Sequence, residues 1–99
     1  MPPLVPVVEF DFTSIESVDQ FYGLAKERLN FPEHFGENLD ALWDVLTGDI
    51  DLPVSVVFKN LNHIKRLQFE NVIEIFSEAA GEMPEEFFFD CRGGEGDSG

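Results

Sequence analysis

The chain has 99 residues and is strongly acidic, with 20 Asp and Glu against 6 Lys and Arg, a formal net charge of −14 and a pI near 4.1. This length accommodates one domain with one modest core, and a composition that is 43% hydrophobic with eleven Phe excludes disorder of the whole chain. The charge excludes nucleic-acid binding and docking on anionic membranes, which need clustered Lys and Arg, and it favours a basic protein as the partner.

The first half of the chain predicts one strand followed by two helices. Alternating apolar residues over positions 7–12 indicate a half-buried strand. Ser17 and Gln20 have the spacing of a capping box, which opens the first helix. The second helix is expected to begin after Asn38, a favourable N-cap, and to end against Gly48 as its C-terminal glycine.

The second half predicts two more strands with helical structure between them. The β-branched run over residues 54–58 indicates a buried strand, and residues 60–66 are expected to form a short helix or turn. Helical periodicity over residues 69–80 predicts an amphipathic helix that Gly81 closes. A last short strand is expected over residues 87–91.

This order of elements predicts an α/β fold. Strands separated by helices favour a small three-stranded parallel sheet packed with about four helices. Residues 7–91 are expected to form the domain. Residues 1–6 form an extended N-terminus, and residues 92–99 form a flexible glycine-rich tail.

Several kinds of site are absent from the sequence. One cysteine, Cys91, excludes an internal disulfide and a zinc site built from several thiolates. No phosphate-binding, dinucleotide-binding, metalloprotease or calcium-binding motif is present, so we expect no cofactor and no metal. The lone cysteine, together with the lack of a signal-peptide pattern and of a long apolar run, predicts a cytoplasmic protein.

The most distinctive segment is acidic. Residues 29–58 contain six Asp and Glu and no Lys or Arg. Glu37, Asp40 and Asp44 follow one another at helical spacing, so their side chains are expected on one face. Either this is a solvated acidic face, or it is a surface built to meet a cationic site.

Trp43 lies beside Asp44 at the edge of the apolar stripe of the same helix. A tryptophan in this position is either a core residue or an interface anchor. The pattern alone does not choose between the two.

Residues 31–48 read FPEHFGENLDALWDVLTG and resemble the barstar family, intracellular inhibitors of barnase-type ribonucleases. The core of the match, GENLDALWD, is long and specific. Weaker similarity extends over roughly residues 7–91, through the first helix, the middle strand and the last helix.

The resemblance implies how such a protein acts. In the family, the second helix and the loop before it plug the ribonuclease active site, and carboxylates stand in for RNA phosphates. Asp44 matches the position whose carboxylate occupies the phosphate site of the enzyme. The matched ribonuclease-binding positions are His34, Gly36, Asn38, Asp40, Trp43, Asp44 and Glu78.

Two positions differ from the residues of the best-known member of the family. His34 stands where a tyrosine caps the interface, and Asp49 replaces an aromatic residue. These differences bear on the identity of the target enzyme more than on the fold. His34 is either an adapted contact residue or an ordinary exposed loop histidine.

The leading hypothesis is a stoichiometric inhibitor of a barnase-type (guanyl-specific) ribonuclease or a related toxin nuclease, monomeric when free and acting as an immunity protein. The alternative is a barstar-fold interaction module that binds another basic protein without inhibiting a ribonuclease. An enzyme with Asp40 and Asp44 as a carboxylate pair or magnesium ligands is disfavoured, because a helix surface neither excludes water nor raises a pKa.

Overall fold

The computed structural model describes residues 5–93, so most of the expected N-terminal segment and glycine-rich tail lies outside the described residues. The described part has the expected α/β composition. Its elements in chain order are β1 (Val7–Asp11), α1 (Val18–Arg28), α2 (Leu39–Gly48), β2 (Val54–Lys59), α3 (His63–Gln68), α4 (Glu70–Glu82) and β3 (Phe87–Cys91).

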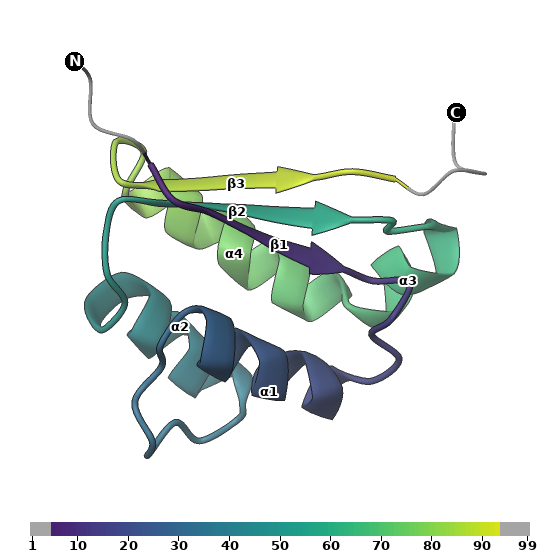
Figure 1. The fold of residues 1–99 in the computed structure, drawn as a ribbon, viewed down its shortest axis with the longest axis horizontal. Helices are drawn as coiled ribbons and strands as arrows, with labels where there is room; N and C mark the ends of the chain where they lie inside the picture. The colour runs from purple at the N-terminus through teal and green to yellow at the C-terminus, as the bar shows by residue number, and fades with distance from the viewer. Residues whose placement is uncertain (1–4, 94–99) are drawn as a thin grey trace.

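The strands form one parallel sheet in the order β1-β2-β3, which confirms the predicted class. The helices α1, α2 and α4 cover one face of the sheet, and α3 lies beyond the carboxyl ends of the strands (Figure 1). Within residues 5–93 no helix covers the opposite face, so Val7 and Phe88, which both pair in register with Ser55, remain 60% and 40% exposed. This one-sided arrangement leaves the outer surfaces of the helices free for binding.

Aromatic rings form the centre of the core between the sheet and the helices. Phe58 of the central strand is fully buried, and its ring centroid lies between 4.8 and 5.7 Å from those of five other rings. The five are Phe10, Phe12, Phe21, Phe76 and Phe89. Because these rings come from α1, α4 and all three strands, they fix the helices relative to the sheet.

The helix ends differ from expectation in one respect. Gly48 is the last residue of α2 and Gly81 lies inside α4, so neither follows its helix as a left-handed cap. No glycine of the described residues has a positive φ. Asp49 closes α2 instead, and its N–H donates to the Val45 carbonyl at 2.9 Å.

Candidate functional site

The helix α2 presents the acidic face that its sequence predicts. Leu42, Val45 and Leu46 are buried, while Asp40 and Asp44 are exposed. The apolar stripe holds the helix on the core, so the two carboxylates project from a fixed backbone. Like charges at this spacing cost the helix a few tenths of a kcal/mol, roughly 0.2–0.5, which the dipole partly offsets for Asp40 in the first turn.

Trp43 belongs both to the core and to the surface of α2. Its ring packs against the core cluster, but the residue is only partly buried. The Thr47 hydroxyl donates to its backbone carbonyl at 2.8 Å. The side chain therefore combines a structural contact with an apolar surface that a partner can cover.

The loop before α2, residues 31–38, is anchored by packing of its own aromatic rings and by a hydrogen bond from α1. Phe31 and Phe35 are buried, and their rings pack edge to face with centroids 4.8 Å apart. From α1, the Lys26 Nζ donates to the Glu33 carbonyl at 3.4 Å. His34, which lies between these two aromatic residues in the sequence, is exposed, as expected for a loop residue. The loop is thus held in place before any partner arrives.

Asn38 joins this loop to the helix. Its Oδ1 accepts from the Ala41 N–H at 2.8 Å, and its Nδ2 donates to the Gly36 carbonyl at 3.2 Å. A Cβ on Gly36 would lie 3.1 Å from the Asn38 Nδ2, so a larger residue there would push the amide out of place. The structure assigns Gly36 and Asn38 a positioning role within the chain.

The prediction that Glu37 shares the helical face is wrong. Glu37 precedes the helix, and its φ of 51° is left-handed, as is the φ of 56° at Asn30 where the loop begins. The backbone turns at both residues, so helical spacing does not set the direction of Glu37. Burial raises the pKa of the Tyr22 hydroxyl above its ordinary value, and the charges of Asp19 and Glu37 raise it further.

Glu78 comes from a different part of the chain. The helix α4 buries Val72, Phe76 and Ala79 and leaves Glu78 exposed. Since α4 packs against α2, Glu78 lies on the helix next to the one that bears Asp44. The other six predicted positions lie within residues 34–44 and are adjacent by sequence alone.

Among residues 5–93, no cation forms an ion pair with the acidic side chains of α2. Within residues 5–93 the ion pairs are Lys59–Glu9 at 3.5 Å and Arg92–Asp90 at 2.9 Å, and all four residues belong to the strands or follow them. The last turn of α2 also has no basic residue. The carboxylates of this face are therefore solvated and free to meet an external cation.

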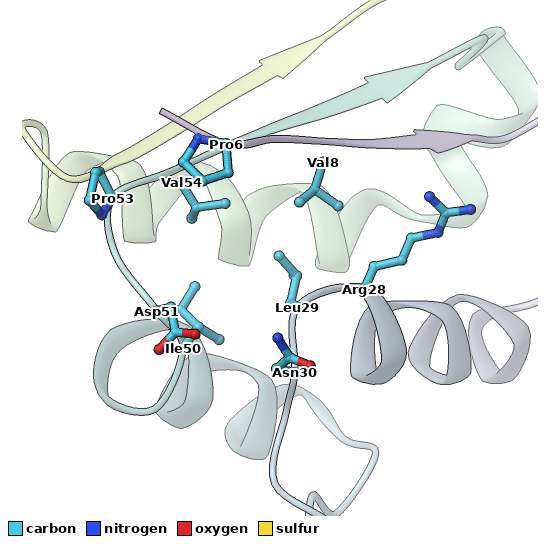
Figure 2. A pocket seen from close by; sticks show the side chains of 9 residues that line it. All are labelled: Pro6, Val8, Arg28, Leu29, Asn30, Ile50, Asp51, Pro53 and Val54. Atoms are coloured by element: carbon cyan, nitrogen blue, oxygen red, sulfur yellow. The ribbon is translucent and has the colours of Figure 1, made fainter. Parts of the chain in front are cut away.

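A hollow of about 160 Å³ lies near this site, between β1, the end of α1 and the segment that joins α2 to β2 (Figure 2). Val8, Leu29 and Ile50 supply apolar walls, and Arg28 and Asp51 stand at its sides. Asp51 is the one carboxylate among the lining residues, which include no His, Cys or Ser. The hollow therefore has neither an acid–base pair nor a nucleophile.

Two kinds of feature are not found among the described residues. Across the described part of the chain, no group of three or more His, Cys, Asp or Glu is placed to hold a metal ion. No helix among the same residues is long and apolar enough to cross a membrane.

Comparison with known proteins identifies the family. Residues 5–92 match the family model described as Barstar (barnase inhibitor). A protein of Bacillus subtilis (strain 168) named "Putative ribonuclease inhibitor YrdF" is 39% identical over 80 residues, which cover 78% of this chain and 88% of that protein. The match to the family model includes all three strands, the anchored loop and α2.

Proposed function

This chain belongs to the barstar family, whose members are inhibitors and not enzymes, and we propose that it is a stoichiometric inhibitor of a barnase-type (guanyl-specific) ribonuclease or a related toxin nuclease. Its partner is a basic protein, and it acts in the cytoplasm as an immunity protein for the cell that makes the nuclease. The free protein is a monomer, because two copies of charge −14 repel each other.

One observation carries the proposal: the exposed carboxylates of Asp40 and Asp44 have no cationic partner in the described structure, on a helix fixed by its buried face. A ribonuclease binds a polyanion, so its active site must contain cationic side chains. Carboxylates on a rigid helix can occupy that site in place of RNA. Asp44 enters the phosphate site, and Asp40 makes the neighbouring acidic contact.

The remaining positions support these two carboxylates. Trp43 covers an apolar part of the enzyme surface beside the charged contacts, and His34 contacts it from the loop. Glu78 adds a third carboxylate from α4. Because the loop and helix are ordered by Phe31, Phe35 and Asn38, little conformational entropy is lost on binding.

A second candidate is a barstar-fold module that binds a different basic protein and leaves ribonucleases active. Two observations favour it: His34 and Asp49 differ from the common family pattern, and both are exposed at the ends of the binding segment. Both candidates predict a basic partner. Only the first predicts loss of RNA cleavage.

The test compares two variants with the same net charge. Asp44→Asn removes a carboxylate from the proposed contact, and Glu27→Gln removes one from the exposed surface of α1. For Asp44→Asn, the free energy of binding to a barnase-type ribonuclease should be less favourable by about 3 kcal/mol, because enzyme cations are left unpaired. Inhibition of RNA cleavage should therefore weaken roughly a hundredfold. Glu27→Gln should cause only a small, salt-dependent change. Equal effects of the two variants would contradict a specific role for Asp44.

A further inference from the structure

The short helix α3 exposes its apolar side chains. It contributes no buried residue to the core. Ile64 and Leu67 are 72% and 60% exposed, whereas Lys65 and Arg66 between them are half-buried. This orientation is the reverse of the one a surface helix normally adopts on a core.

Polar contacts hold α3 in this orientation. The Asn62 side chain accepts from the Lys65 N–H at 2.8 Å and caps the helix. Lys65 Nζ donates to the Ile15 carbonyl, and Gln68 Nε2 donates to the Glu16 carbonyl at 2.6 Å. The position of α3 therefore does not depend on burial of its apolar residues, which are left available.

A hollow of about 330 Å³ lies between α3 and the first turn of α4, and of the two exposed apolar residues Leu67 lines it. His63, Arg66 and Leu67 line it from α3, and Glu70 and Ile73 line it from α4. In a chain of charge −14, α3 bears two cationic side chains, Lys65 and Arg66, and no acidic one. The Arg66 guanidinium forms no ion pair with any of the described residues.

We propose that this surface, formed by Ile64, Arg66, Leu67 and Ile73, docks a short amphipathic segment of a second protein. The segment places a large apolar side chain against Ile64 and Leu67 and a carboxylate on Arg66. Apolar contact supplies the affinity, and the charge pair orients the segment.

The net charge of the chain and the charged side chains around α3 favour this occupant over others. A second copy of the chain would bring together two net charges of −14. An anionic membrane or a nucleic acid needs several clustered cations, whereas Lys65 is engaged by a backbone carbonyl and Glu70 stands beside Arg66. One apolar anchor with one carboxylate matches what the surface offers.

The surface lies apart from the proposed inhibitory site. The helix α3 follows the carboxyl end of β2, whereas the end of α2 leads to the beginning of β2, at the opposite end of the sheet (Figure 1). The proposal does not depend on ribonuclease inhibition.

The probe is an acetylated, amidated peptide of Leu and Ser residues with a single Glu, and its binding is followed by the amide chemical shifts of the labelled protein. We expect shifts centred on α3 and no change in fluorescence from Trp43, the single tryptophan. Leu67→Ser and Arg66→Glu should each weaken binding at least about tenfold. Arg28→Glu, the matched charge reversal at the end of α1, should leave the affinity unchanged. Thermal unfolding checks that each variant is folded.

Three outcomes would overturn the proposal. The first is no binding of the peptide at millimolar concentration. The second is equal binding of a peptide in which Ser replaces Leu or Lys replaces Glu. The third is a dimer in sedimentation equilibrium that Leu67→Ser dissociates, which would make the occupant a second copy.

Discussion

Asn38 determines how the loop over residues 31–38 enters α2, because its amide bonds to both. Asn38→Ala should lower the free energy of unfolding by about 1 kcal/mol, as loss of an N-cap does, and should weaken inhibition because the loop loses its bond at Gly36. Asn38→Asp keeps the acceptor for Ala41 and loses only the donor, so its stability should stay near that of the wild type. Urea unfolding followed by the inhibition assay measures both effects. Full inhibition by Asn38→Ala would contradict the positioning role.

Asp11, at the end of β1, gives the protein a specific sensitivity to acid. Its carboxylate accepts from the Asn60 Nδ2 at 2.8 Å and from the Thr13 N–H at 2.9 Å, and these bonds hold the pKa of Asp11 below the ordinary value of 3.8. Since the pKa is lower in the folded state, the stabilisation is present above the ordinary value and is lost as pH falls through the folded one.

Asn60→Gly tests this contribution, because glycine accepts the left-handed φ of 59° at that position and removes the amide. The variant should be less stable than the wild type near neutral pH, and the difference should shrink toward pH values below the ordinary Asp pKa. Urea unfolding across that range measures it. A difference that does not change with pH would show that Asp11 is not the group involved.

At the scale of elements, β2 carries the residue on which the fold most depends. Phe58→Ala should lower the free energy of unfolding by about 3–5 kcal/mol, because five neighbouring rings would line the cavity that it leaves. Phe88→Ala, on the open face of β3, is the matched control and should cost much less. Calorimetric unfolding measures both variants. A similar loss in the two would contradict a core centred on Phe58.

Most elements could be predicted from sequence because each has a local cause. The capping box at Ser17 was confirmed, with its side chain accepting from the Gln20 N–H at 3.1 Å. Asn38 was likewise confirmed as the N-cap of α2. The end of α2 at Gly48 was confirmed, but the role of Gly48 and Gly81 as C-terminal caps was wrong, because a glycine is also tolerated in the last turn of a helix. Glu37 was misplaced, because a left-handed residue before the N-cap breaks helical spacing.

The candidate site could be predicted only in part. Residues 34–44 are contiguous, so a short motif was enough to single them out. The loop anchors Phe31, Phe35 and Lys26 act through packing and one long-range hydrogen bond, which no local pattern reveals. The outward orientation of Ile64 and Leu67 likewise depends on polar contacts from residues distant in sequence.

At the scale of the whole molecule, the account depends on charge. The exposed carboxylates of Asp40 and Asp44 have no ion-pair partner among the described residues, and the chain has a net charge of −14. In the proposed function, this charge attracts a basic enzyme from a distance. This attraction is screened by salt, so the rate of association should fall as salt increases. In the proposed complex, the short-range contact of Asp44 is less screened and should chiefly control dissociation.

The most direct test of the central claim is titration of the full chain into a barnase-type ribonuclease while RNA cleavage is followed at low and moderate salt. We predict that cleavage falls linearly to completion at one inhibitor per enzyme, and that association slows as salt increases. A ribonuclease that stays fully active at a large excess of the protein would contradict the inhibitor assignment for this enzyme class. That result would not contradict the barstar fold, and it would favour a different basic partner for the acidic face.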